Sequence, residues 1–314
     1  MRTVFLGTSE FAAAVLRRLA ESPHRPARVV TRPDAPRGRG RKLAAPPVAG
    51  AARELGLDLD QPESVNAEEA RARIEAARPE AVCVCAFGAL VREPLLSAYP
   101  MLNVHPSLLP RWRGAAPVER AIMAGDAETG VSIMQLVAEL DAGPVALRAA
   151  DPIGPDDTYG SLAPRLERIG GDLLVEALDR WPVEFAPQDE AGVTYAEKIG
   201  PQDRTLDPSR PAAELERTVR ALTPHIGARA ALPEGEFLRI HEAAPAAGDG
   251  APDTPGRGGS SGAADSPGAA LFARDGRLFL RAADGALELR TVQPPGGRAM
   301  AAGDFLRGHD VPAR

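Results

Sequence analysis

An amide and an imidazole stand two residues apart in the stretch NVHPSLLPRWRGAAP, at Asn103 and His105. If this position is the end of an extended strand, both side chains leave the same face. An amide N–H can stabilise a developing oxyanion, and an imidazole can move a proton near neutral pH. The pair therefore suits chemistry at a carbonyl carbon. The alternative is a buried structural histidine followed by an ordinary proline-rich loop.

A carboxylate that could act with this imidazole stands at Asp141, in the turn ELDAGPV after a later predicted strand. A carboxylate beside an imidazole raises the basicity of the ring and fixes its tautomer.

Other mechanisms have less support. The turn GTSEF lacks the G-x-S-x-G pattern of a nucleophile elbow, and Ser107 is better explained as a loop cap than as a nucleophile. The five histidines are scattered, which disfavours a metal site. Direct group transfer at a carbonyl is the chemistry that remains.

Apolar runs that alternate with helical patterns predict the elements that would position these residues. The run 80–86 is typical of a buried strand, and 101–105 of a shorter one that ends at His105. Polar groups at the ends of parallel strands commonly face a ligand crevice. The alternation predicts an open, mostly parallel, Rossmann-like α/β domain over residues 1–184. Further strands are expected at 3–6, 27–31, 130–137 and 144–153, and helices after the N-cap Ser9, at 46–56, at 67–79 and at 159–178.

The second half of the chain has a different pattern. Residues 185–204 show little periodicity and are expected to form a linker on the surface. A helix at 211–222 and short strand-like pieces joined by Asp-Gly turns predict a small C-terminal β-barrel, OB-like, over 205–314. Residues 244–268 are rich in Ala, Gly, Pro and Ser and are expected to form a flexible loop in that domain.

Composition limits the class of protein. The chain has 314 residues, a formal charge of −6 and a pI near 5.5, so binding of nucleic acid would need a local basic patch. The two cysteines, Cys83 and Cys85, share one face of a predicted strand and are interpreted as small buried residues of a reduced protein. No signal peptide or membrane-length apolar run is present, so a soluble, cytoplasmic protein without a membrane partner, acting as a monomer, is expected.

The stretch NVHPSLLPRWRGAAPVERAIMAGDAETGVSIMQL, with LDAGPV after it, resembles the signature of the 10-formyltetrahydrofolate-dependent formyltransferases. The resemblance implies 10-formyltetrahydrofolate as co-substrate and no metal. It also implies a catalytic trio of Asn103, His105 and Asp141. By the same resemblance, the folate site is lined by the loop Ser107, Leu108, Leu109 and Pro110, with Phe87 and Gly88 as a neighbouring wall. Because the whole superfamily shares these residues, they fix the chemistry and leave the formyl acceptor open.

The acceptor is indicated by longer stretches. RWRGAAPVERAI, GTSEFAAAVLRRL, RPDAPRGRGRKLAAPPV, TYAEKI and QPPGGRAMAAGDFLRG are similar to the branch of the family that formylates methionine on initiator tRNA. Sugar formyltransferases lack the RGRGRKL loop. An enzyme that formylates an amino-sugar nucleotide with the same trio is the alternative. A nucleic-acid-binding module with an inactive folate site is a third hypothesis, against which the trio itself argues.

The basic loop also has an interpretation from its residues. It carries Arg37, Arg39, Arg41 and Lys42 between glycines, a composition typical of phosphate binding, although a solvated charged loop has the same composition. The resemblance implies that the loop wedges at the acceptor stem of tRNA and that Arg39 is its specificity residue. The run RALTPHIGARAAL departs from the usual tryptophan-containing pattern, so His225 and Arg229 have no assigned role.

Overall fold

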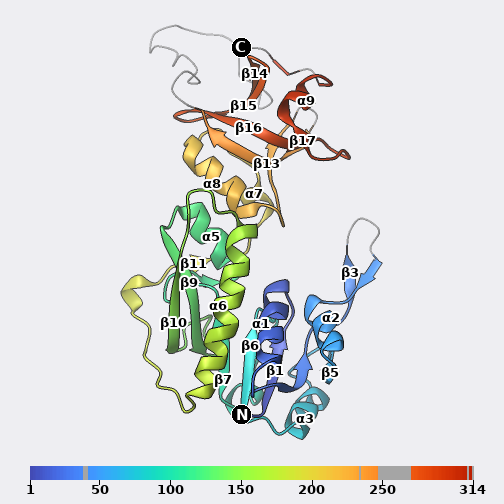
Figure 1. Ribbon diagram of the computed structural model, residues 1–314, viewed down its shortest axis with the longest axis vertical. Helices are drawn as coiled ribbons and strands as arrows, with labels where there is room; N and C mark the ends of the chain where they lie inside the picture. Colours follow the sequence, from blue (N-terminus) through green and yellow to red (C-terminus); the bar gives the residue numbers. More distant parts are fainter. Residues whose placement is uncertain (38–41, 233–234, 247–269, 310, 313–314) are drawn as a thin grey trace. The chain divides into compact units, whose positions relative to one another are not determined.

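The computed structural model describes residues 1–314 except 38–41, 233–234, 247–269, 310 and 313–314 (Figure 1). The chain forms two compact units, each described separately below. The first unit comprises Met1–Pro117, Glu128–Pro152 and Leu162–Glu197, and the second comprises Val118–Ala127, Ile153–Ser161 and Lys198–Arg314. The first unit therefore continues past residue 184, and two short segments from within the predicted domain 1–184 belong to the second unit.

A seven-stranded sheet with the order β10-β9-β7-β6-β1-β2-β5 forms the centre of the first unit. Five consecutive strands of this sheet pair in parallel, as the sequence predicts. In spatial order they are β7, β6, β1, β2 and β5. The edge is different, because β9 runs antiparallel to β7 and β10 antiparallel to β9. The strands are β1 (Thr3–Gly7), β2 (Pro26–Val30), β5 (Leu59–Asp60), β6 (Ala81–Cys85), β7 (Met101–His105), β9 (Glu128–Gln135) and β10 (Val145–Pro152).

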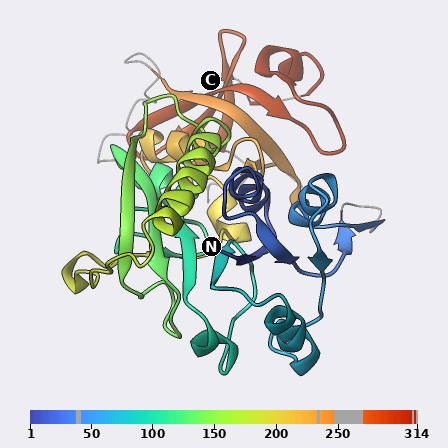
Figure 2. The same cartoon turned by 60° about the horizontal axis from the view of Figure 1, so that its bottom comes forward.

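Helices cover both faces of this sheet. On one face α1 (Glu10–Ala20) and α6 (Tyr159–Asp179) lie side by side (Figures 1 and 2), joined by an ion pair of 2.6 Å between Arg18 and Asp172. Ser9 caps α1 by accepting the N–H of Ala12, which confirms the predicted helix start. On the other face, α3 (Glu68–Ala76) and α4 (Leu95–Ala98) join a core cluster with alternate residues of β1 and β6 and with Met101 of β7. Helix α2 (Pro47–Glu54) also belongs to this unit.

The two cysteines lie on β6, where both are fully buried and neither forms a disulfide. Burial raises the pKa of the Cys83 thiol to about 12 and raises that of Cys85 as well. Since only the thiolate is nucleophilic, we expect neither cysteine of the folded protein to react with a disulfide reagent at pH 8. Cys83→Ala and Cys85→Ala should also keep the turnover of the wild type. Stoichiometric labelling without denaturant, or lost turnover at an unchanged Tm, would contradict the packing role.

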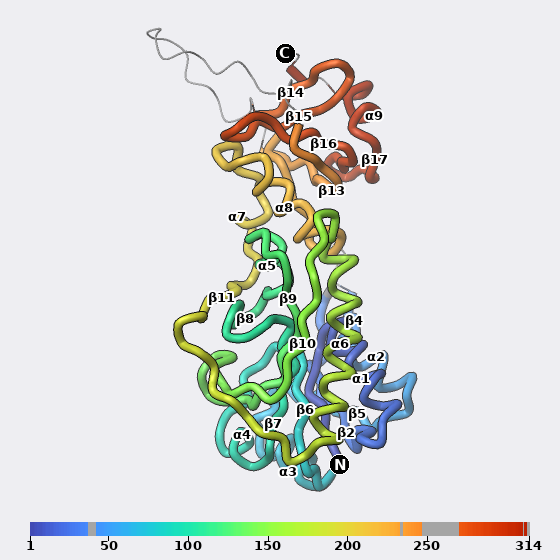
Figure 3. Tube along the Cα trace, turned by 60° about the vertical axis from the view of Figure 1, so that its left-hand side comes forward, coloured from blue at the N-terminus to red at the C-terminus, as the bar shows by residue number. Residues whose placement is uncertain are grey.

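Residues 185–204, predicted as a surface linker, are partly built into the first unit. After α6 the chain runs back along this unit to β11 (Tyr195–Ala196), which pairs in parallel with β8 (Arg113–Gly114) (Figure 3). Ala186 exchanges two backbone hydrogen bonds with Val145, and the side chain of Gln188 is buried. Backbone pairing rather than an apolar face holds this segment, which explains why its sequence lacks periodicity.

The second unit contains an antiparallel sheet with the order β12-β13-β16-β15-β14, and β17 pairs with β16. Helix α8 (Ala212–Leu222) supplies Leu215, Val219 and Leu222 to its core. The predicted mixed α/β class with a C-terminal antiparallel sheet is confirmed; in the part of the chain that is described, the sheet curls without β12 pairing to β14. Its strands are β12 (Ala228–Ala231), β13 (Phe237–Pro245), β14 (Leu271–Arg274), β15 (Arg277–Ala282), β16 (Gly285–Gln293) and β17 (Met300–Ala301).

The smaller elements complete the description. Within the described residues, no helix has the length and apolar character needed to cross a membrane. They also contain no group of three or more His, Cys, Asp or Glu side chains that could hold a metal ion. The remaining elements are β3 (Ala35–Arg37), β4 (Lys42–Ala44), α5 (Pro117–Ala124), η1 (Glu190–Gly192), α7 (Pro201–Arg204) and α9 (Ala302–Leu306).

Candidate active site

A cavity of about 570 Å³ opens in the first unit beyond the carboxyl ends of β6 and β7. Its walls are residues 86–91 after β6, the end of β7, and the turn 136–141 after β9. Asn103, His105 and Asp141 all line it, so the structure brings together the three residues that the sequence singles out. The carboxyl ends of parallel strands are the usual place for a ligand in such a sheet.

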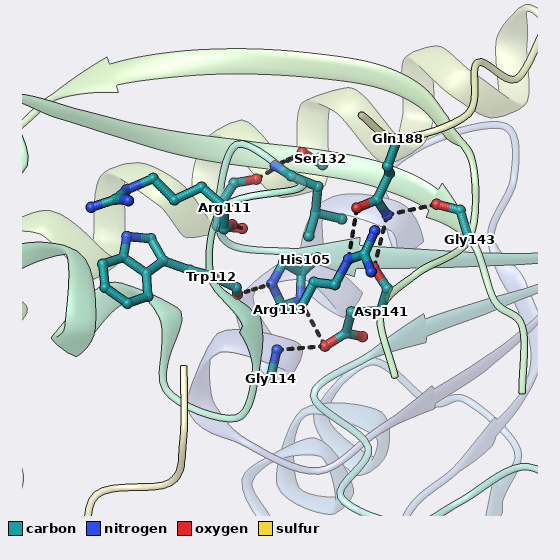
Figure 4. A network of polar contacts seen from close by, with 11 residues as sticks. His105, Arg111, Trp112, Arg113, Gly114, Ser132, Asp141, Gly143 and Gln188 are labelled. Atoms are coloured by element: carbon teal, nitrogen blue, oxygen red, sulfur yellow. Dashed lines mark hydrogen bonds and ion pairs between the residues drawn. The ribbon is translucent and has the colours of Figure 1, made fainter. Parts of the chain in front are cut away.

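The imidazole of His105 is held by its Nε2 atom, which lies 2.9 Å from the backbone carbonyl oxygen of Trp112 (Figure 4). A carbonyl oxygen can only accept a hydrogen bond, so Nε2 carries the hydrogen. The other ring nitrogen, Nδ1, lies 3.7 Å from Oδ2 of Asp141. In the neutral ring Nδ1 therefore keeps its lone pair, and Nδ1 is the atom that can gain and lose a proton.

The carboxylate of Asp141 is oriented by the main chain of a second loop. Its Oδ2 accepts the backbone N–H of Gly114 at 2.8 Å, and its side chain is 13% exposed. The backbone of Asp141 is left-handed, with φ 47°, a conformation that aspartate tolerates better than most residues. Because Oδ2 faces both Gly114 and His105, the carboxylate is placed to stabilise the imidazolium that forms when Nδ1 takes a proton.

Asn103 supplies an amide to the same cavity. It lies between Val84 of β6 and Met134 of β9 in the sheet register and is 8% exposed. Among the described residues, no hydrogen-bond partner is found for its side chain, although a buried amide normally has one. An amide N–H that faces a cavity with no partner in the protein can donate to an oxygen of a ligand, including one that develops negative charge.

The loop after His105 is held by hydrogen bonds from two serine hydroxyl groups to its backbone. Ser107 Oγ donates to the carbonyl of Arg111 at 2.6 Å, and the hydroxyl of Ser132 bridges the carbonyl of Ser107 and the N–H of Leu109. Ser107 and Leu109 are buried, and Leu108 and Pro110 are half-buried. None of these four lines the cavity, whereas Phe87 and Gly88 do. These hydrogen bonds fix the backbone of the loop that ends at Trp112, whose carbonyl oxygen is the partner of His105.

The sequence assigns no role to three residues of this network: Thr194, Gln188 and Arg113. Thr194 accepts the N–H of Trp112 through its hydroxyl at 2.9 Å, and its carbonyl accepts the N–H of Arg113. Gln188 bonds to the backbone of the Asp141 turn and to Arg113. Each partner is tens of residues away in the chain. Arg113 lies in the motif RWRGAAPVERAI and Thr194 in TYAEKI, but neither motif indicates these contacts.

The residues expected to bind tRNA are only partly described. Arg37 ends β3 and Lys42 begins β4, and the two are paired in a short antiparallel ladder. Lys42 is exposed. Arg39 and Arg41 lie outside the described residues.

His225 and Arg229, which the sequence leaves without a role, have structural partners in the second unit. His225 Nε2 lies 3.0 Å from Glu119, and its ring stacks on Tyr159. Arg229 donates to Thr205 and lies over the ring of Phe237.

Comparison with known proteins finds matches to an N-terminal and to a C-terminal region of the chain. Residues 1–178 match the family described as formyl transferase, and residues 198–310 match its C-terminal domain. A methionyl-tRNA formyltransferase of Halorhodospira halophila is 44% identical over 312 residues, covering 98% of this chain and 96% of the relative. One from Methylococcus capsulatus is 45% identical over 316 residues, covering 98% and 97%.

Two solved structures show the same fold. HypX from Aquifex aeolicus, in complex with tetrahydrofolic acid, has a TM-score of 0.62 at 19% identity, and the match covers 100% of this chain and 49% of HypX. An N-formyltransferase from Helicobacter canadensis, bound to folinic acid and dTDP-3-aminofucose, has a TM-score of 0.63 at 13% identity, covering 92% and 98%. At these identities the likeness concerns the fold alone.

Proposed function

The chain belongs to the formyl transferase family, and from this membership we propose that it formylates the methionine carried by initiator tRNA. The formyl donor is 10-formyltetrahydrofolate, and the acceptor is the α-amino group of the esterified methionine. One observation carries the chemistry: Asn103, His105 and Asp141 all line a single cavity. Nearly full-length similarity to methionyl-tRNA formyltransferases supports the choice of acceptor.

The arrangement of the three side chains assigns each a step. The neutral amine attacks the formyl carbon, and the amide of Asn103 donates to the oxyanion of the tetrahedral intermediate. Nδ1 of His105 takes the proton from the attacking nitrogen, while Asp141 stabilises the imidazolium. The same Nδ1 then gives the proton to N10 of the folate as the bond from carbon to N10 breaks. Because Nε2 is held by Trp112, both proton transfers use one ring nitrogen.

We place the folate in the cavity beside Phe87 and Gly88; the backbone of Gly88 is left-handed, with φ 73°. Cavities of several hundred Å³ commonly enclose ligands of this size. The loop 107–110 remains a proposed folate contact, made through its main chain or through Leu108 and Pro110, since Ser107 and Leu109 are buried. We further propose that the chain acts in the cytoplasm, because both of its proposed substrates are cytoplasmic. We also propose that it acts as a monomer.

The test is a comparison of acceptors with 10-formyltetrahydrofolate as donor. We expect rapid formylation of methionyl initiator tRNA, much slower formylation of methionyl elongator tRNA, and none of amino-sugar nucleotides. Formylation of an amino-sugar nucleotide with tRNA inactive would replace this acceptor by the alternative that the sequence left open. Absence of transfer to any amine would contradict the reaction itself.

The basic loop gives a second test of the acceptor. Arg39→Ala should raise the KM for initiator tRNA about ten- to a hundred-fold, the value of one charge-assisted hydrogen bond, and leave the KM for folate unchanged. The slope of log K for tRNA binding against log salt should also fall by about one charge. Binding titrations at several salt concentrations measure this slope. If both quantities match those of the wild type, the loop is only a solvated surface.

A further inference from the structure

Gln188 lies in the segment between α6 and β11, two residues after the backbone pair of Ala186 and Val145. This backbone pair brings the segment beside the turn that precedes β10. Gln188 is 9% exposed, so its amide must find its hydrogen-bond partners within the protein.

The amide of Gln188 makes three hydrogen bonds, visible in Figure 4. Its Nε2 donates to the carbonyl of Asp141 at 2.8 Å and to that of Gly143 at 2.7 Å. Its Oε1 accepts from Nε of Arg113 at 3.0 Å. The orientation of the amide is therefore determined, because two carbonyls can only accept and a guanidinium can only donate. Gln188 thus joins the turn that carries Asp141 to the loop that carries Gly114.

The turn needs such a constraint. Asp141 is left-handed, and Gly143 approaches Gln135 so closely that a Cβ atom on Gly143 would lie 1.8 Å from the Gln135 carbonyl oxygen. A strained turn persists only where its surroundings determine it. If the carbonyls of Asp141 and Gly143 lose their donor, the peptide planes can rotate. The carboxylate of Asp141 then leaves its place near His105 and Gly114.

Arg113 supports Gln188 by donating a hydrogen bond to its Oε1 atom. It is 4% exposed, and its Nη2 has no hydrogen-bond partner among the described residues, with Glu190 at 3.6 Å. The residue that follows Arg113 in the chain, Gly114, donates to the carboxylate of Asp141. The side chain of Gln188 and the main chain of Gly114 therefore hold Asp141 from two directions, one at the backbone and one at the carboxylate.

We propose that Gln188 is a positioning residue for Asp141, which sets the distance of that carboxylate from His105 through the backbone of the turn. This inference rests on the proposed function, since formyl transfer is its readout. Gln188 touches neither the cavity nor a reacting atom in this role. Its contribution should therefore appear in kcat and depend on the presence of the Asp141 carboxylate.

Gln188→Glu tests the proposal with little change of shape. The new carboxylate still accepts from Arg113, but it can no longer donate to the two carbonyls. We expect kcat with methionyl initiator tRNA to fall about 10- to 100-fold, because a small displacement of a catalytic group has effects of that size. The KM values for both substrates should stay within about two-fold. In an Asp141→Asn background, the same substitution should change kcat less than about two-fold, because the charge that it positions is already absent.

Two further variants complete the experiment. Glu184→Gln, which changes an exposed carboxylate of the same segment that forms no hydrogen bond or ion pair with this network among the described residues, should keep the kcat of the wild type. If Gln188→Glu fails to fold, Gln188→Met removes the donors without adding a buried charge and takes its place in the cycle. An unchanged kcat for the Gln188 variant, or an equal loss in both backgrounds, would overturn the proposal. An inactive wild type would instead reject the proposed function.

Discussion

Replacing His105 with alanine is expected to lower kcat for formyl transfer by about 10²- to 10⁴-fold, the usual contribution of a general acid–base group. The reason is that Nδ1 of this ring is the proton carrier in both halves of the reaction, with Nε2 committed to the Trp112 carbonyl. Asp141→Asn should lower kcat by a similar order, since it removes the charge that stabilises the imidazolium. Folate affinity, measured by titration, should stay close to that of the wild type.

A second buried histidine provides the control. His24 is 6% exposed and lies 2.8 Å from Asp179, a shorter distance than that between His105 and Asp141. It does not line the cavity. His24→Ala should therefore reduce the free energy of unfolding while leaving kcat unchanged. Near-normal turnover for both His105→Ala and Asp141→Asn would contradict the assigned mechanism.

Gly114→Ala is expected to damage both stability and catalysis. Gly114 has φ 125°, which L side chains rarely adopt, and a Cβ atom there would lie 2.7 Å from the carbonyl oxygen of Ala196. Backbone strain and overpacking each cost about 1–3 kcal/mol, so the free energy of unfolding should fall by roughly 2–6 kcal/mol. Urea denaturation measures this change. Because the N–H of Gly114 orients Asp141, kcat of the folded fraction should fall as well.

Gly56→Ala is the matched control for this substitution. Gly56 is also left-handed, with φ 62°, but no heavy atom lies within 4 Å of a Cβ placed there. Alanine at this position should cost only the backbone term, about 1–2 kcal/mol, without an effect on kcat. If Gly114→Ala is no more harmful than Gly56→Ala, the close approach of β8 to β11 does not restrict the residue at position 114.

Local patterns were sufficient to predict the elements that carry the trio. The apolar run 80–86 and the shorter run ending at His105 became β6 and β7, paired in parallel. Strand alternation alone put Asn103 and His105 on one face, and both line the same cavity. Ser9 was recognisable because a cap lies within one turn of the helix it begins. These features depend on residues that are close together in the chain.

The supports of the site could not be predicted in the same way. Gln188 and Thr194 act through hydrogen bonds to backbone atoms, and any residue type can supply a backbone partner. Such contacts leave no periodic pattern, so the segment that contains them was interpreted as a linker. The antiparallel edge of the sheet was missed for a related reason: the apolar patterns of β9 and β10 fit either strand direction.

The pairing of β8 with β11 has a consequence for how the protein is made. Trp112 leaves the ribosome 82 residues before Thr194, the residue that accepts its backbone N–H. The last two strands of the first sheet, β9 and β10, and its long covering helix α6 are synthesised in that interval. A nascent chain that has reached Asp179 therefore holds a complete sheet beside an unpinned loop. The ability to formylate should appear late in synthesis, and fragments intended to retain it should extend at least to Glu197.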